Sequence, residues 1–191
     1  EYQNEGIFAT GDTGLVVNSN YSNGNGGGIY LSQYGTSTLQ GFDNIDVSSN
    51  ISDNVGGGMF INVWSNIEFK LSNSRFTENI SKSSGGGIYM QGDGDELEIS
   101  NSIISLNKSN DAGAIYANNI DLILISSTLF DNPVYSSTAG SNASVYLNNQ
   151  SDLHIWNSII GGQNLVTSST GWIIDMDDYS NHTIEFESAQ V

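Results

Sequence analysis

The segment Gly85-Gly86-Gly87-Ile88-Tyr89 is one copy of a motif that returns along the whole chain. The other copies are Gly27-Gly28-Ile29-Tyr30, Gly57-Gly58-Met59-Phe60, Gly113-Ala114-Ile115-Tyr116, Ala143-Ser144-Val145-Tyr146 and Gly171-Trp172-Ile173-Ile174. The aliphatic residue of the motif recurs every 27 to 30 residues. Repetition at such a period is typical of solenoids, in which each repeat buries its apolar face against its neighbours.

A second block recurs with the same period. Its copies are Asn44-Ile45-Asp46-Val47, Asn73-Ser74-Arg75-Phe76, Asn101-Ser102-Ile103-Ile104, Ser127-Thr128-Leu129-Phe130 and Asn157-Ser158-Ile159-Ile160. Between the blocks, apolar and polar residues alternate, as in Phe69-Lys70-Leu71 and Leu97-Glu98-Ile99, which indicates strands with one buried face. We therefore predict an all-β, single-stranded right-handed parallel β-helix of about six coils of 26–30 residues.

The chain of 191 residues is expected to form a single domain over residues 1–191. Residues 1–20 lack the motif and are expected to form an irregular first coil or a cap. The chain reaches the strand-like segment Ile184-Glu185-Phe186 with no recognisable cap, so we expect a fragment of a longer surface protein. For the same reason, end-to-end contact with further coils or with another subunit is expected.

Composition restricts the partners. Acidic residues outnumber basic ones 21 to 4, which gives a formal net charge of −17. Such a surface repels phosphate backbones and anionic membranes, so nucleic-acid binding is not expected. No apolar stretch has the ~18 residues of a membrane helix, so direct membrane insertion is not expected either. The chain contains no cysteine, which excludes disulfides and thiolate metal sites.

Two short motifs carry a family resemblance. The first is Gly26-Gly27-Gly28-Ile29, repeated at Gly85-Gly86-Gly87-Ile88 and reduced to Gly113-Ala114-Ile115. The second is Phe76-Thr77-Glu78-Asn79, with looser copies at Val47-Ser48-Ser49-Asn50 and Ile104-Ser105-Leu106-Asn107. Together they resemble the repeats of the polymorphic outer-membrane proteins of chlamydiae and related bacterial surface proteins.

The resemblance covers roughly residues 20 to 165 and implies a β-helix passenger of the adhesin or autotransporter kind, extracellular or at the cell surface. It supplies no catalytic residues. The fifth coil departs from the pattern, because Phe130-Asp131-Asn132-Pro133 places its asparagine one position early. The sixth coil departs further, with Ile160-Gly161-Gly162-Gln163.

Asn50, Asn79 and Asn107 occupy equivalent positions in three successive repeats. We expect them to form a structural ladder in which stacked amides hydrogen-bond to each other and to the backbone of the turns. Each of the three also begins an Asn-x-Ser sequon, so N-glycosylation is the alternative.

The aromatic residue of the first motif is expected to face outward. Alternation in Ile29-Tyr30-Leu31 places the aliphatic residues inside, so the aromatic residues would stack on the outer surface. This candidate ligand-binding ladder comprises Tyr30, Phe60, Tyr89, Tyr116 and Tyr146. It is either a self-stabilising column or a face that recognises a glycan or a surface protein.

Two acidic segments are candidates for binding Ca²⁺, the only cofactor that the sequence suggests. Asp93 and Asp95 lie in a predicted turn between two strands, and Asp175, Asp177 and Asp178 follow the last copy of the first motif. Carboxylates one residue apart in a loop can converge on one ion, although solvated acidic turns are the simpler interpretation.

No catalytic group stands out in the sequence. The four basic residues are too few for a lyase that acts on polyanions, and nothing marks a facing pair of carboxylates. We therefore expect a non-catalytic extracellular module for adhesion or cell-surface architecture, which recognises a glycan or protein through the aromatic ladder or the turn loops. A carbohydrate-active β-helix, hydrolysing or cleaving a polysaccharide, is the alternative.

Overall fold

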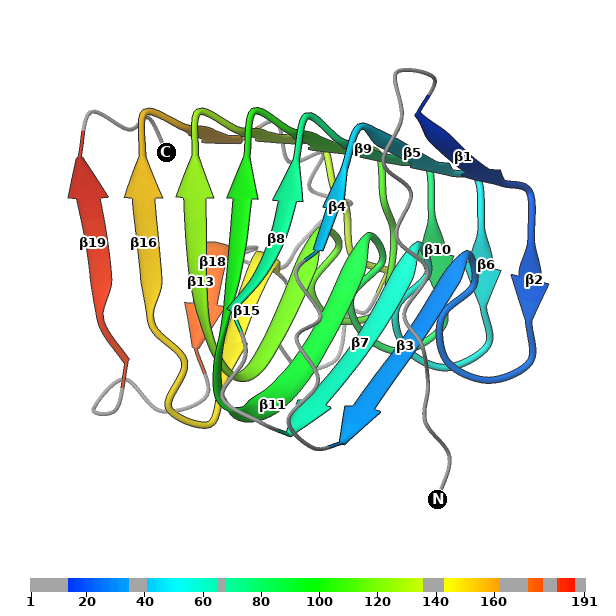
Figure 1. The fold of residues 1–191 in the computed structure, drawn as a ribbon, viewed down its shortest axis with the longest axis horizontal. Coiled ribbons are helices and arrows are strands. Elements are labelled where there is room, and N and C mark those ends of the chain that lie inside the picture. Colours follow the sequence, from blue (N-terminus) through cyan, green and yellow to red (C-terminus); the bar gives the residue numbers. More distant parts are fainter. Residues whose placement is uncertain are drawn as a thin grey trace.

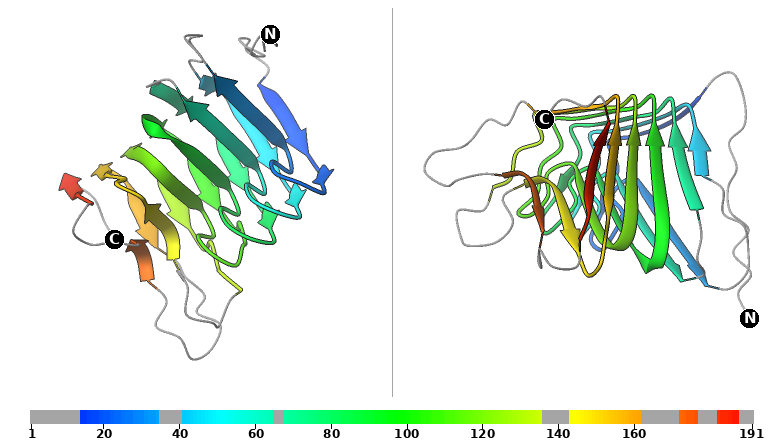
Figure 2. Two further views of the ribbon diagram at one scale, coloured as in Figure 1. Left: turned by 90° about the horizontal axis from the view of Figure 1, so that it is seen from below. Right: turned by 90° about the vertical axis from the view of Figure 1, so that its left-hand side faces the viewer.

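The computed structural model describes residues 14–34, 41–64, 68–135, 143–161, 172–176 and 182–187. Throughout these ranges the chain forms strands and turns, with no helix. Every described strand pair is parallel, and the strands stack in layers along one axis (Figures 1 and 2). The fold is the right-handed parallel β-helix that the repeat predicts.

Two of its faces are separate sheets. The β1 sheet contains β1 (Leu15–Asn18), β5 (Ile45–Ser48), β9 (Arg75–Thr77), β12 (Ile103–Ser105), β14 (Thr128–Phe130) and β17 (Ile159–Gly161). The β2 sheet contains β2 (Tyr21–Ser22), β6 (Ile51–Ser52) and β10 (Ile80–Ser81). The six strands of the β1 sheet enclose about five turns of the solenoid between the first strand and the last. This number is slightly lower than the six coils expected.

The remaining ten strands form one large sheet with two halves. The β3 half contains β3 (Ile29–Tyr34), β7 (Met59–Trp64), the first part of β11 (Ile88–Ser100), the first part of β13 (Ile115–Ile125), β15 (Ala143–Asn148) and β18 (Trp172–Met176). The β4 half contains β4 (Gly41–Asp43), β8 (Glu68–Ser72), the second parts of β11 and β13, β16 (Leu153–Trp156) and β19 (Ile184–Glu187). The upward arrows in Figure 1 belong to the β4 half.

The interior is filled by aliphatic and aromatic side chains from all three long faces. In the β1 sheet the inward column is Val17, Val47, Phe76, Ile104, Leu129 and Ile160. From Val47 to Ile160 these side chains are buried. On these strands, the apolar residues of the alternating sequence pattern point into the core and the residues between them point to the surface.

The expected turn at Asp93–Glu96 does not form. β11 runs on as one strand from Ile88 to Ser100, and Gly92, Asp93 and Gly94 lie opposite the single residue Asn119 of β13. Gly94 has a φ of 77°, which favours glycine. The acidic segment is a bulge that bends a continuous strand from the β3 half into the β4 half.

The triple glycine of the first motif serves two purposes. Its first residue takes a positive φ of 66–68° at Gly26, Gly56 and Gly85. Its second residue lies so close to the next coil that a Cβ on Gly57 would approach the Gly86 carbonyl oxygen to 2.4 Å. Ala112 keeps the positive φ of the first position in the fourth copy, at 48°.

Asn50, Asn79 and Asn107 are fully buried and stack in one column, with Asn20 at one end and Asn132 at the other. Each amide donates to the next one; the Asn79 Nδ2–Asn107 Oδ1 distance is 2.9 Å. The second Nδ2 proton reaches a strand carbonyl, as from Asn79 to Val47 at 2.8 Å. Because these amides are buried and donate twice, glycosylation would require the coil to open.

The fifth coil follows the pattern with a register one residue earlier than expected. Leu129 pairs with Ile104 and is buried, whereas Phe130 is outside. The motif in this coil is therefore Leu129-Phe130-Asp131-Asn132, with the same spacing as Phe76-Thr77-Glu78-Asn79. The expectation that Asn132 departs from the pattern was therefore wrong. It arose because Leu129 and Phe130 are adjacent apolar residues, and the sequence did not show which of them points inward.

A serine ladder occupies the corner before the β1 sheet, whereas the asparagine ladder occupies the corner after it. Its members are Ser74, Ser102, Ser127 and Ser158. Each hydroxyl donates to the carbonyl two residues earlier and accepts from a backbone N–H of the preceding coil, as in Ser74 N to Ser102 Oγ at 3.0 Å. The residue before each of these serines has a positive φ; it is asparagine, which tolerates this conformation, at 73, 101 and 157, and serine at 126.

The expected irregular region at residues 1–20 lies mostly outside the described residues. Its later part is regular, because Leu15–Asn18 pairs in register with β5.

Asn79→Ala should lower the free energy of unfolding by about 2–4 kcal/mol. The substitution leaves the Val47 carbonyl, the Asn50 amide and the Asn107 carbonyl oxygen without this partner in a buried column, and orphaned buried groups cost about 1–3 kcal/mol each. Urea denaturation measures the change. Asn54→Ala is the control, because Asn54 is exposed and, among the described residues, its side-chain amide bonds to Asn25 alone. Equal losses for the two variants would contradict a stabilising role for the ladder.

Candidate functional site

The aromatic residues of the first motif form one column on the outer side of the β3 half. Strand register aligns Tyr30, Phe60, Tyr89, Tyr116 and Tyr146 directly. Successive ring centroids are 5.1, 5.7, 4.8 and 5.1 Å apart, and the rings of Tyr89 and Tyr116 are nearly parallel, at 9°. The column is a continuous stack along the axis of the solenoid.

The members of this aromatic column differ in exposure. Tyr30, at one end of the column, is 56% exposed, whereas Phe60, stacked between Tyr30 and Tyr89, retains only 3% of its surface. The expectation that all five are exposed was therefore wrong for Phe60. Tyr89, Tyr116 and Tyr146 are half-buried. A ligand approaching from outside would meet the ring edges along the column and a ring face at Tyr30.

A column of mostly amide side chains runs beside the aromatic column, two residues further along each strand. Its members are Ser32, Asn62, Gln91, Asn118 and Asn148. Gln91 Nε2 donates to Asn62 Oδ1 at 2.9 Å, and Asn148 Nδ2 donates to Asn118 Oδ1 at 3.1 Å. We did not identify this amide column from the sequence, although its position two residues after each aromatic was a visible clue.

A hydrogen bond between the side chains of Tyr89 and Asn118 joins the two columns. Trp64 Nε1 donates to Asn62 Oδ1 at 2.7 Å, which fixes a half-exposed indole at the margin of the amide column. Burial raises the pKa of the Tyr89 hydroxyl, and a hydrogen bond with the Asn118 side chain opposes that rise. Tyr89 therefore remains a neutral hydroxyl at physiological pH, able both to donate and to accept. We call the two columns together the aromatic–amide strip.

Asp93 and Asp95 lie in different environments. Asp95 is fully buried, and its Oδ2 accepts the backbone N–H of Asp93 at 2.8 Å. The Asp93 side chain is exposed and lies 3.5 Å from Asn119 Nδ2. The Asp95 carboxylate therefore caps the bulge in β11. Asp175 pairs with Tyr146 at the end of the aromatic column, and its side chain lies outside the described residues, as do Asp177 and Asp178.

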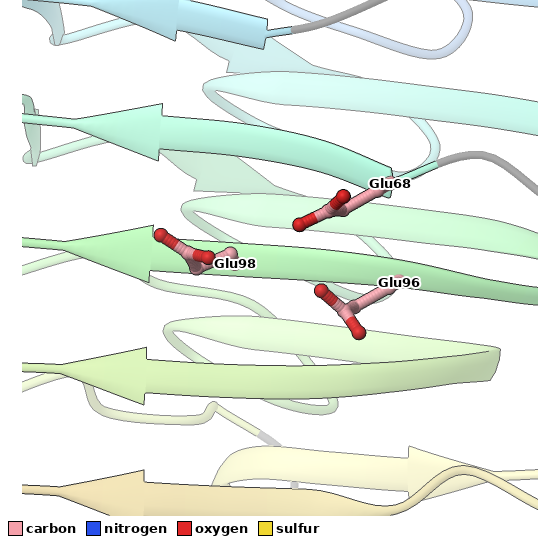
Figure 3. Close-up of side chains that lie close together, drawn as sticks. All are labelled: Glu68, Glu96 and Glu98. Carbon is pink, nitrogen blue, oxygen red and sulfur yellow. The ribbon is translucent and has the colours of Figure 1, made fainter.

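A different acidic cluster lies on the outer side of the β4 half. Glu68 from β8 meets Glu96 and Glu98 from β11, with one carboxylate oxygen of each within 4.8 Å of the others (Figure 3). Lys70 already compensates part of this charge, because its ammonium lies 2.5 Å from Glu68 and 3.1 Å from Glu98. A cation at this position would have to compete with the lysine.

Glu96 is the carboxyl in this cluster without a described lysine contact. Burial raises its pKa, and the neighbouring charges of Glu68 and Glu98 raise it further. Asp121, which pairs with Glu96 on the next strand, adds a smaller effect in the same direction. The cluster was missed in the sequence, although aligning Phe69-Lys70-Leu71 with Leu97-Glu98-Ile99 places Glu68 beside Glu96.

Comparisons with known proteins found no match: no family model, no curated protein and no solved structure resembles this chain significantly. Among the described residues, no helix has the length and apolar character needed to cross a membrane.

The Glu96 carboxyl should titrate above its ordinary value near 4.5, and Glu68→Gln should lower the midpoint. Since the folded-state pKa is raised, this group stabilises the fold at low pH, and that contribution is lost as the pH rises through the folded pKa. Carbon-detected NMR of the side-chain carboxyl measures both midpoints. Glu78→Gln, on the β1 side, is the matched control. An unchanged Glu96 midpoint in Glu68→Gln would contradict the proposed repulsion.

Proposed function

We propose that this protein is a non-catalytic β-helix module that binds glycan chains along the aromatic–amide strip, in adhesion or cell-surface architecture. One observation supports this proposal above the others. A stacked aromatic column and a parallel amide column run side by side over five successive strands of the β3 half.

The chemistry of the strip suits sugars. A pyranose presents C–H groups that pack on aromatic surface and hydroxyls that both donate and accept hydrogen bonds. The ring edges of the aromatic column and the exposed ring of Tyr30 give the strip an apolar surface for the sugar C–H groups. The amides of the second column carry both donor protons and acceptor lone pairs, and those not used within the protein suit hydroxyls of either orientation.

The length of the strip favours a chain over a single sugar. Five strands at about 4.8 Å per step extend it over roughly 20 Å, parallel to the axis of the solenoid. Equivalent groups repeat at every step, so a polymer can be held by many weak contacts in several registers. Multivalent binding of this kind gives useful avidity from individually weak sites.

Charge selects among the candidate glycans. The chain carries a formal net charge of −17, and the acidic cluster of the β4 half lies beyond the bulge in β11 that ends the strip. Polyuronates and sulfated glycans would be repelled by this field. We therefore propose neutral glycans as the ligands. The extracellular or cell-surface location rests on the resemblance of the repeats to bacterial surface proteins.

Tyr30→Ala should weaken binding to a neutral glycan by roughly tenfold or more, because an exposed aromatic anchor contributes about 1–2 kcal/mol. The protein is first screened on a glycan array, with and without a chelator, and the best neutral oligosaccharide is then titrated by calorimetry. Tyr135→Ala is the matched control, since Tyr135 is 58% exposed, close to the 56% of Tyr30, and lies off the strip.

Asn118→Ala tests the amide column in the same titration and should also weaken binding. Retained affinity in both strip variants, or an equal loss in Tyr135→Ala, would refute the strip as the site. An array with no bound glycan would refute the proposed function itself. Binding lost under the chelator would point to a bound cation instead of the strip alone.

Glycoside hydrolysis is the second candidate, favoured by the raised pKa of Glu96 next to Glu98. Hydrolases pair a protonated carboxylic acid with an ionised carboxylate, and retaining enzymes hold the two about 5–5.5 Å apart. In this reaction Glu96 would be the general acid and Glu98 the nucleophile. The ammonium of Lys70 lies 3.1 Å from Glu98 and would pair with the carboxylate that this role requires.

Under the hydrolase alternative, Glu96→Gln should reduce the release of reducing ends by about 100-fold or more, since general acid catalysis contributes roughly 10²–10⁴. The assay incubates the protein with the glycans bound on the array and measures new reducing ends. Glu78→Gln is again the control. Binding without any release by the unaltered protein would exclude this alternative for those glycans.

A further inference from the structure

An exposed apolar patch lies on the outer side of the β1 sheet, away from the strip. Its members are Ile103 at 43% exposure, Leu106 at 41%, Phe130 at 51% and Ile159 at 46%. Register aligns Ile103, Thr128 and Ile159 in one outward column across three successive strands. These residues contribute nothing to the core, which the adjacent inward column fills.

Geometry makes the four side chains one continuous surface. Phe130 lies in the next outward column, between Ser105 and Gly161, and a Cβ added to Gly161 would meet no atom within 4 Å. Leu106 projects from the turn after β12 and its backbone bonds to the Phe130 carbonyl. The large ring of Phe130 is therefore flanked by two small residues, which leaves its sides open.

The margin of the patch is acidic. Glu78, Leu106 and Asp131 occupy equivalent positive-φ positions in successive turns, so a carboxylate lies on each side of Leu106. The buried Oδ1 of Asp131 accepts no hydrogen bond from the described residues. Arg75, on the neighbouring strand, lies 3.6 Å from Asp46 and adds no net positive charge.

We propose that this patch docks a protein segment that presents apolar side chains flanked by arginine or lysine. Apolar side chains on the segment would cover Ile103, Phe130 and Ile159, since contiguous exposed patches of this kind mark interaction sites. A flanking guanidinium would pair with the exposed Glu78 carboxylate, and the charge of Asp131 on the other side of Leu106 would favour a second basic residue. This inference is independent of glycan binding, which involves a different face.

Charge argues against a second copy as the occupant. Each chain has a formal net charge of −17, so two copies joined through patches with acidic margins would repel each other. A basic partner instead gains steering from the same field, and its binding should weaken as salt is added.

The test uses a displayed peptide library of unbiased charge, selected on the unaltered protein. Binders are then counter-selected on Ile103→Thr/Phe130→Ser/Ile159→Thr. The replacements copy residues already present in the same columns, Thr128 and Ser105, so the strands should be retained. Val16→Thr is the control, because Val16 lies in the same outward column at its far end and is 61% exposed.

We expect enriched peptides that combine apolar residues with arginine or lysine, and roughly tenfold or more weaker binding to the triple variant. Val16→Thr should bind them normally, and the NMR signals of the Ile103 and Ile159 methyl groups should shift on titration. Failure to enrich peptides over the triple variant would overturn the proposal, as would enrichment of acidic or uncharged ones. Dimerisation in sedimentation that the triple variant abolishes would overturn it in favour of a second copy.

Discussion

Parallel pairing between coils is the interaction on which the rest of this structure depends. Each residue lies about 4.8 Å from its counterpart one coil away, with both backbones hydrogen-bonded in register. A side chain therefore has the equivalent side chain of the next repeat as an unavoidable neighbour. Inside the solenoid, a polar residue is tolerated when that neighbour can complete its hydrogen bonds, as Asn79 and Asn107 do for each other.

The same constraint shapes the surface. Aromatic residues at one outward position become a stack, and amides two residues later become a parallel column. Carboxylates at another outward position are brought together, where burial and the neighbouring charges raise the pKa of Glu96 and where Lys70 contacts two of the three carboxylates. Side chains of one chemical type are therefore gathered into columns that run along the axis of the solenoid.

The three long faces consequently differ in the partners they suit. The β3 half carries the aromatic–amide strip, the β4 half the acidic cluster, and the β1 sheet the apolar patch at its later strands. The bulge at Asp93 separates the first two faces by bending a single strand, with Asp95 holding the bulge closed. A repeat protein of this kind can carry three chemically distinct outer faces without any additional domain.

The sequence alone determined the solenoid, because two motifs with one period and alternating apolar residues admit little else. It also identified the asparagine and aromatic columns, whose members share a repeat position. It did not resolve whether Leu129 or Phe130 faces inward, since adjacent apolar residues leave the register ambiguous and a shift by one residue exchanges inside and outside. For side chains outside the repeated motifs, only the tertiary structure decided which of them meet across coils. Glu68 and Glu96 are far apart in the chain, and it is strand register that makes them neighbours.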